Sequence, residues 1–199
     1  MKIDVFDFDG TIYDGDSTVD FLCFCLGKKP WLSLLCLPPL LRALAGRLSG
    51  RFSLTEFKGD LFSVFARRFR LEEAAEEFWS REKTRAKLGR WFLERERTLP
   101  VVIASASPDF ELAPAARLLR ADALVCTRCD PATGRVIGKN CKSAEKIERI
   151  RAVFGECEAR SMYTDNVRAD GPLLEIAEEK YLVRHGKVKR ISSVCGSGS

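Results

Sequence analysis

The sequence is poor in histidine and in long apolar runs, and each shortage excludes a class of protein. The single histidine, His185, precedes Gly186 in a predicted turn, so we expect a surface residue rather than a catalyst. A transmembrane helix needs about 20 consecutive apolar residues. The most apolar stretch, residues 31–45, is shorter and is interrupted by two prolines and Arg42, so no membrane-spanning helix is predicted.

The sequence also has no recognisable export signal and no internal repeats. The first apolar strand begins at residue 2, so we expect no cleaved leader, and no internal repeat or low-complexity block occurs. The eight cysteines are irregularly spaced, and without an export signal we expect them to be reduced and mostly buried. These features predict a cytoplasmic protein.

Cys126 and Cys129 form a CxxC pair. Neither a second pair nor a histidine lies at metal-ligand spacing, which argues against a zinc or redox site. We predict instead that this segment is a strand.

The charge balance is mildly basic, with a net charge of +5 and with lysine and arginine scattered along the chain. Such a balance favours anionic small molecules or a membrane surface as partners, and it gives no support to nucleic acid. A chain of 199 residues is long enough for one domain, or for one domain with an insertion.

Strand and helix patterns alternate in most of the chain. The predicted strands cover residues 2–6, 101–104, 123–127, 160–164 and 181–183, and residues 136–137 are expected to return the chain as a β-hairpin. The predicted helices cover residues 19–26, 31–45 (a helical hairpin), 53–69, 71–92, 109–120, 143–154 and 172–179. This order predicts an α/β fold: a Rossmann-like parallel sheet with helices on both faces. We expect an α/β core from residues 1–14 and 91–195, an inserted all-helical cap at 15–90, and a flexible tail at 196–199.

Polar side chains follow three of the predicted strands where each strand ends. Asp7 and Asp9 follow the first strand, Ser105 follows the second and Asp165 follows the fourth. The carboxyl ends of parallel strands meet at one edge of a sheet, which is where ligands of such folds bind. Alternation turns Asp7 and Asp9 the same way, and Gly10 allows close approach of the backbone.

This set of residue types suits phosphoryl transfer. Asp7 and Asp165 can hold Mg²⁺, which takes oxygen ligands and shares a substrate phosphate. A serine hydroxyl and a lysine can neutralise the remaining phosphate oxygens. Asp7 is then the expected nucleophile, forming an aspartyl-phosphate, and Asp9 the expected general acid and base.

The same residues resemble the four motifs of the haloacid dehalogenase-like phosphatases. The run 7–11 (Asp-Phe-Asp-Gly-Thr) resembles the first motif, Ser105 the second, a lysine that begins a helix the third, and Thr164–Asp165 with Asp170 the acidic fourth. The all-helical insertion after the first motif resembles the phosphoserine-phosphatase-like subgroup. The runs 29–41, 140–147 and 163–174 also resemble the phosphatidylglycerophosphatase C family, which implies a lipid phosphate as substrate.

The resemblance implies a set of site residues. Asp7 and Asp9 are catalytic; Gly10, Thr11, Ser105, Ala106 and Lys146 bind phosphate; Asp7, Asp9 and Asp165 bind Mg²⁺; and Asp16, Lys142, Asn166 and Asp170 contact the substrate or support the site. Two assignments stay open. Lys142 competes with Lys146 for the phosphate, and Asp16 faces the substrate or caps the helix that follows it.

We therefore expect a Mg²⁺-dependent phosphomonoesterase that acts on a small organic phosphate or a lipid phosphate. Residues 31–45 pack against their own helical neighbours or make a peripheral contact with a membrane. The alternative is a non-catalytic binding or regulatory protein on a phosphatase fold.

Overall fold

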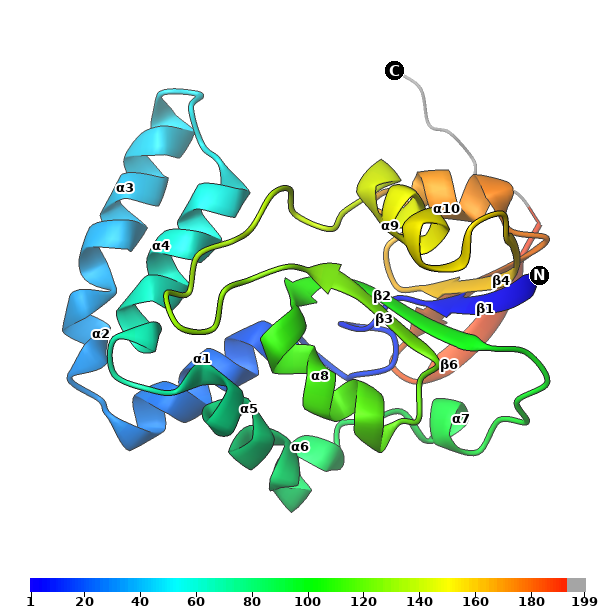
Figure 1. Ribbon diagram of the computed structural model, residues 1–199, viewed down its shortest axis with the longest axis horizontal. Helices are drawn as coiled ribbons and strands as arrows, with labels where there is room; N and C mark the ends of the chain where they lie inside the picture. The colour runs from blue at the N-terminus through cyan, green and yellow to red at the C-terminus, as the bar shows by residue number, and fades with distance from the viewer. Residues whose placement is uncertain (193–199) are drawn as a thin grey trace.

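The computed structural model describes residues 1–192 and contains a six-stranded sheet in the order β3-β2-β1-β4-β5-β6 (Figure 1). The strands are β1 (Lys2–Phe6), β2 (Val101–Pro108), β3 (Ala123–Thr127), β4 (Glu158–Thr164), β5 (Glu179–Arg184) and β6 (Lys187–Ile191). The first five strands run parallel, and β6 pairs antiparallel with β5. The predicted α/β class is confirmed.

Helices cover both faces of this sheet because its central strand alternates between two hydrophobic cores. Ile3 and Val5 pack with α9 (Ala144–Phe154) and α10 (Gly171–Ile176) on one face. Phe6 belongs to the other core, with α7 (Arg90–Leu93) and α8 (Asp109–Leu118). Figure 1 shows α9 and α10 on one side of the strands and α7 and α8 on the other. Burial on both faces accounts for the apolar residues of β1, and the one buried charge among them, Asp4, is paired with Arg95.

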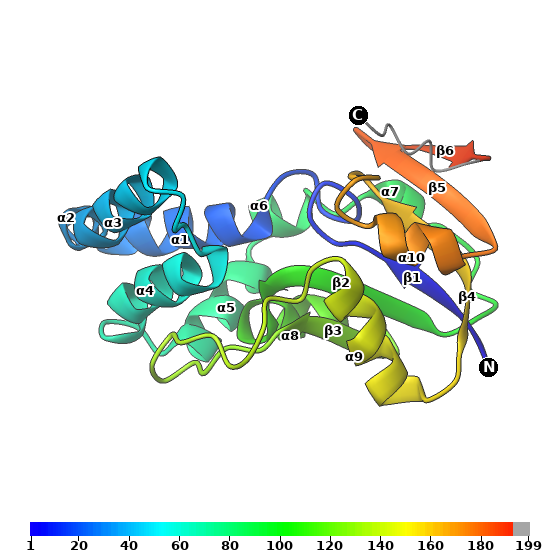
Figure 2. The same ribbon diagram turned by 90° about the horizontal axis from the view of Figure 1, so that it is seen from above.

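The secondary-structure elements assigned between β1 and β2 are all helices. Its elements are α1 (Ser17–Lys28), α2 (Leu32–Leu35), α3 (Leu37–Leu48), α4 (Leu54–Ala66), α5 (Leu71–Ser80) and α6 (Glu82–Arg85), followed by α7. Figures 1 and 2 place α2, α3 and α4 beyond the end of the sheet that lies opposite the N-terminus. Asp16 caps α1 by accepting a hydrogen bond from the Val19 N–H, and Ser53 caps α4 in the same way.

The single amphipathic helix predicted over 71–92 is wrong, because the structure has three short helices there. The chain is extended at Arg81 and is then tied to the loop after β1 by backbone hydrogen bonds. The Lys87 carbonyl accepts from Asp14 N at 2.8 Å, and Gly89 N donates to the Ile12 carbonyl at 2.7 Å. These contacts stop the helix that the amphipathic pattern would have continued.

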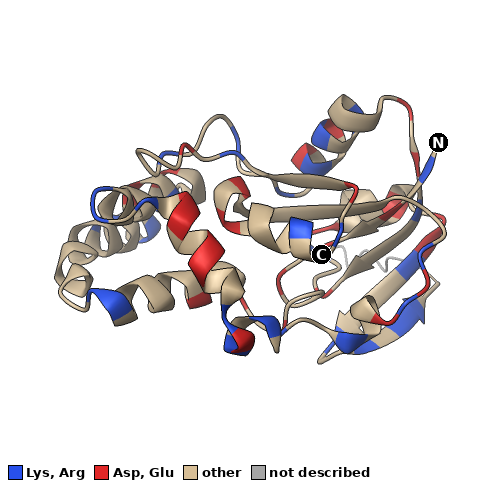
Figure 3. Ribbon diagram, turned by 60° about the horizontal axis from the view of Figure 1, so that its bottom comes forward, with Lys and Arg blue, Asp and Glu red and all other residues tan. Residues whose placement is uncertain are grey.

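The last strand, β6, was not predicted, and it makes the sheet mixed rather than purely parallel. His185 and Gly186 form the turn before it with φ angles of 48° and 72°, and His185 is exposed as expected. β6 is rich in lysine and arginine and largely exposed, a common way of protecting a sheet edge. Figure 3 shows that lysine and arginine are distributed over helices and strands alike.

Other predictions concern cysteine, the membrane and the tail. All seven cysteines within residues 1–192 are free, and five are buried, including Cys126 and Cys129. Cys129 pairs with Val136 in an isolated antiparallel bridge, as the predicted hairpin requires.

Within residues 1–192, no helix combines the length and the apolar character needed to cross a bilayer. The predicted tail at 196–199 lies outside the described residues.

Candidate active site

The two aspartates of the first motif sit where β1 ends. The Asp7 N–H donates to the Tyr163 carbonyl of β4 at 2.9 Å, which extends the strand pairing by one residue. Phe8, between the aspartates, is fully buried and lies beside the rings of Tyr13 and Trp79. Burying Phe8 turns both aspartates away from that core and toward the carboxyl edge of the sheet.

Gly10 is required by its position. Its φ angle is +73°, and a Cβ at this residue would lie 2.4 Å from Oδ2 of Asp165. Any other residue would therefore be strained and would displace the Asp165 carboxylate. This close approach brings the first motif against the end of β4.

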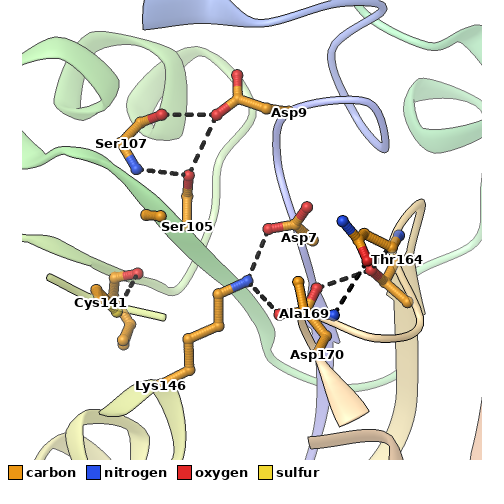
Figure 4. A network of polar contacts seen from close by, with 12 residues as sticks. Asp7, Asp9, Ser105, Ser107, Cys141, Lys146, Thr164, Ala169 and Asp170 are labelled. Atoms are coloured by element: carbon orange, nitrogen blue, oxygen red, sulfur yellow. Dashed lines mark hydrogen bonds and ion pairs between the residues drawn. The ribbon is translucent and has the colours of Figure 1, made fainter. Parts of the chain in front are cut away.

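Lys146 joins two of the predicted carboxylates. Its Nζ lies 2.8 Å from Oδ1 of Asp7 and 2.7 Å from Oδ1 of Asp170 (Figure 4). Oδ2 of Asp170 in turn accepts a hydrogen bond from the Thr164 hydroxyl at 2.7 Å. The Lys146 side chain is 3% exposed, so this ammonium group and its partners form a buried network.

Burial dominates the electrostatics of this network. It raises the pKa of Asp7 to about 7, although the Lys146 charge acts in the opposite direction. Burial by itself would lower the pKa of Lys146, but the charges of Asp7 and Asp170 raise it above the usual value. Burial also raises the pKa of Asp165, and the charge of Asp170 adds to that shift. A site with this excess of carboxylates favours a bound cation.

Asp9 lies apart from the lysine network. Its Oδ1 accepts the Ser17 N–H at 2.7 Å, and its Oδ2 accepts the Ser107 hydroxyl at 2.6 Å. Ser105 is farther from the same oxygen, at 3.4 Å, and its hydroxyl accepts the Ser107 N–H at 3.1 Å. Figure 4 shows Asp9 directed toward the two serines of β2 and Asp7 directed toward Lys146. The two aspartates thus have different surroundings.

A cleft of about 440 Å³ opens over these residues. The residues of its floor belong to the sheet edge and to the segments around it: Asp7, Asp9, Ser105, Ala106, Lys142, Lys146, Asp165, Asn166 and Asp170. The other side is lined by residues of α1, its cap and α4: Asp16, Thr18, Val19, Leu22, Leu54, Phe57, Lys58, Leu61 and Phe62. The cleft therefore has a charged floor and a largely apolar wall. Its two sides come from the sheet edge and from the helical segment between β1 and β2.

The remaining predicted residues take varied positions. Lys142 is exposed at the cleft, whereas Lys146 makes the ion pair with Asp7. Asn166 is exposed, and its Oδ1 accepts the Ala169 N–H. The Thr11 hydroxyl is buried and has no hydrogen-bond partner among the described residues. The Ala106 carbonyl accepts hydrogen bonds from the side chains of Lys58 and Thr127.

Sequence reasoning missed four polar residues of the site: Thr18, Lys58, Ser107 and Glu111. Ser107 had a usable signal, because it lies two residues after Ser105 on the same strand and so faces the same side. Thr18, Lys58 and Glu111 lie on helices, and only the packing of those helices brings them to Asp9 and Ala106.

The fold and the site together define an α/β enzyme with paired carboxylates at the carboxyl edge of its sheet. The family model described as haloacid dehalogenase-like hydrolase matches residues 5–175, and the chain belongs to this family. Protein CicA of Caulobacter vibrioides is 34% identical over 197 residues, which covers 92% of this chain and 86% of that protein.

Two solved structures share the fold. A protein with unknown function from Bordetella pertussis Tohama I superposes with a TM-score of 0.68 at 20% identity, covering 90% of this chain and 88% of the other. A phosphoserine phosphohydrolase-like protein from Francisella tularensis gives a TM-score of 0.56 at 17% identity, with coverages of 90% and 86%.

Proposed function

We propose that this protein is a Mg²⁺-dependent phosphomonoester hydrolase that acts through an aspartyl-phosphate on Asp7. The observation that carries the proposal is the contact of 2.8 Å between Lys146 Nζ and Asp7 Oδ1 at the floor of the cleft. It pairs a carboxylate nucleophile with a cation suited to a phosphate oxygen. The phosphoserine phosphohydrolase-like name of the Francisella protein agrees with this chemistry.

Asp7 and Asp9 have different roles in the proposed reaction. A carboxylate oxygen of Asp7 attacks phosphorus, the ester P–O bond breaks, and Asp9 gives a proton to the departing alkoxide. Water then attacks the phosphorus of the acyl phosphate, Asp9 takes a proton from that water, and the bond to Asp7 breaks to release phosphate. Asp9 suits both steps because Ser17 and Ser107 hold its carboxyl group in place.

The residues present fit Mg²⁺. Asp7 and Asp165 supply two carboxylates at the cleft. Mg²⁺ is commonly bound by one or two carboxylates together with water and a substrate phosphate. Asp9 is the third proposed ligand, and both of its carboxylate oxygens also accept hydrogen bonds. The bound cation would neutralise charge on the phosphoryl group.

We assign the phosphate oxygens to Ser105, Ala106 and Lys146, which line the cleft, and to Gly10 and Thr11, which follow Asp9 in the chain. Lys142, Asn166 and Asp16 are assigned to the substrate or to support of the site, and Asp170 to holding Lys146. We further propose that residues 15–90 act as a cap over a core formed by 1–14 and 91–195.

A small organic phosphate is the first candidate substrate, and a lipid phosphate is the second. The second is favoured by the apolar wall of the cleft and by the outer surface of α2 and α3. Seven leucines of these helices are more than two-fifths exposed: Leu34, Leu35, Leu37, Leu40, Leu41, Leu44 and Leu48. Residues 28–52 include five lysines and arginines and no acidic residue, which suits an anionic lipid surface. We therefore propose a cytoplasmic protein that can bind the membrane peripherally.

A screen of metabolite and lipid phosphates with Mg²⁺ tests the proposal. We expect turnover that Asp7→Asn abolishes and that a chelator of divalent cations suppresses. An Asp7→Asn variant that keeps wild-type turnover would exclude the mechanism. No turnover on any phosphate would favour a non-catalytic protein.

A further inference from the structure

A second carboxyl group, Glu111, is joined to Asp9 through two hydroxyl groups. Glu111 lies on α8 and is fully buried. Its Oε2 is 2.9 Å from the Thr18 hydroxyl, which is 3.0 Å from the Ser107 hydroxyl. The Ser107 hydroxyl is 2.6 Å from Oδ2 of Asp9. The four groups form an unbroken chain from α8 through α1 and β2 to the end of β1.

Each hydroxyl in this chain has one proton to donate, so the hydrogen bonds must all point the same way. If the Glu111 carboxyl is neutral, it donates to Thr18, Thr18 donates to Ser107, and Ser107 donates to Asp9. If Glu111 is ionised, Thr18 must donate to Glu111 instead. The Thr18–Ser107 contact is then left without a proton, because the Ser107 proton is held by the Asp9 carboxylate, and Ser107 loses the donor that orients its hydroxyl group toward Asp9.

The surroundings of Glu111 favour the neutral form. Its Oε1 is buried and has no well-formed hydrogen bond among the described residues, which costs far less for a carbonyl oxygen than for a carboxylate, and the hydroxyl groups of Thr18 and Ser17, which favour the ionised form, are outweighed by burial. Burial raises the pKa of Glu111 to about 8, and the charge of Asp9 adds to the shift. The titratable groups that face Glu111 come from several elements: Asp9, Tyr13, Asp16, Cys25, Lys58 and Cys129. Lys58 is the one cation in this set, and its charge acts to lower the pKa of Glu111.

The position of Glu111 is fixed by the packing of α5 on α8. The Trp79 indole N–H donates to the main-chain carbonyl of Glu111 at 2.8 Å. Trp79 is buried and packs its ring against Phe8, the residue between the two aspartates. Glu111 and Asp9 are therefore held against the same aromatic core.

We propose that Glu111 is a positioning residue for Asp9: as a neutral donor it orients the hydroxyls of Thr18 and Ser107 so that Ser107 holds the Asp9 carboxyl group. This rests on the proposed function, in which Asp9 moves the proton. Glu111 touches neither the cleft floor nor the phosphate site, so its effect falls on kcat and leaves KM nearly unchanged.

Four variants test the direction of the chain, with 4-nitrophenyl phosphate and Mg²⁺ as the probe. Wild-type kcat should fall above about pH 8, where Glu111 ionises. Glu111→Gln keeps an N–H donor that cannot ionise, so this alkaline fall should disappear. Glu111→Leu and Thr18→Val remove a link of the chain and should lower kcat by about tenfold at every pH. Thr18→Ser keeps the hydroxyl and should restore the wild-type profile.

The outcomes separate this inference from the proposed function. An unchanged pH profile in Glu111→Gln, or wild-type kcat in Glu111→Leu, would overturn the role of Glu111 while leaving the phosphatase intact. If the wild type has no activity, the proposed function fails, and the state of Glu111 is read directly by carbon-13 NMR of its carboxyl group. A neutral carboxyl at pH 7 is expected, and an ionised one would overturn the inference. Thermal unfolding confirms that each variant is folded.

Discussion

Lys146 Nζ lies 2.8 Å from Oδ1 of Asp7, and this single ion pair connects α9 to the end of β1. The opposite side of the ammonium group is held by Asp170 at 2.7 Å. In the proposed reaction, the bond to Asp170 keeps Lys146 in place when a substrate phosphate competes for its contact with Asp7. In this proposal the lysine has a structural and a functional role in the same position.

Replacing Lys146 with methionine should damage both roles. It leaves the Asp7 and Asp170 carboxylates facing each other without a cation, and breaking a buried ion pair costs about 3–5 kcal/mol. Urea unfolding should show that loss, and kcat/KM should fall by at least about a hundredfold. Lys142→Met is the matched comparison, because Lys142 is exposed: its free energy of unfolding should change by less than about 0.5 kcal/mol. A larger activity loss in Lys142→Met than in Lys146→Met would reassign the phosphate lysine.

Gly10→Ala should weaken Mg²⁺ binding. The new Cβ would lie 2.4 Å from Oδ2 of Asp165, and the backbone has a positive φ angle. Displacing Asp165 should raise the Mg²⁺ concentration needed for half-maximal activity, and the fold should lose about 1 kcal/mol or more. Gly27→Ala is the control, since a Cβ there meets nothing within 4 Å and the residue lies inside α1. Equal Mg²⁺ requirements in the wild type and Gly10→Ala would contradict this account of Asp165.

Much of this site could be predicted from residue spacing, and the rest depended on packing. The ends of the parallel strands brought Asp7, Ser105 and Asp165 to one edge, as the order of strands and helices required. The sequence could not indicate which of Lys142 and Lys146 lies beside Asp7, because that depends on the orientation of α9. Asp7 and Asp9 were predicted to point the same way, but the partners of Asp9, the Ser17 N–H and the Ser107 hydroxyl, depend on how α1 and β2 pack around it.

The fold also has parts that could be predicted from the sequence and parts that depended on packing. Short apolar runs predicted the buried strands well, because burial on both faces leaves a strong pattern. They did not predict β6, whose charged residues carry no such pattern. The amphipathic pattern over 71–92 could not indicate that Lys87 and Gly89 bond to the loop after β1 and so interrupt the helix. Tertiary hydrogen bonds of this kind leave no local signal.

Glu111→Gln should make the fold less sensitive to pH. Burial raises the pKa of Glu111 from 4.5 to about 8, so above pH 4.5 the unfolded chain releases a proton that the folded protein keeps. The contribution of Glu111 to stability is thus complete below pH 4.5 and is lost as the pH rises to about 8. Relative to the wild type, Glu111→Gln should gain on the order of 5 kcal/mol across this range. Chemical denaturation at several pH values measures the difference, and parallel curves would contradict the shift.

Leu41→Glu should weaken binding to anionic vesicles. Leu41 is 63% exposed on α3, where it can enter a lipid surface, and a carboxylate there would also repel anionic headgroups. Co-sedimentation with vesicles containing phosphatidylglycerol should fall, whereas neutral phosphatidylcholine vesicles should bind little of either protein. Leu118→Glu is the matched control, because Leu118 is 45% exposed on α8, outside the α2–α3 surface. If the wild type binds neither kind of vesicle, the small soluble phosphate becomes the preferred substrate.

The central claim is that Asp7 carries the phosphoryl group during turnover. Acid quenching of the enzyme during turnover of 4-nitrophenyl phosphate, followed by mass spectrometry of its peptides, tests it most directly. We predict one added phosphoryl group on the peptide that contains Asp7. It should accumulate in Asp9→Asn, where water is poorly activated, and be absent in Asp7→Asn. Steady turnover with no phosphorylated peptide, or with the phosphoryl group on another residue, would contradict the account.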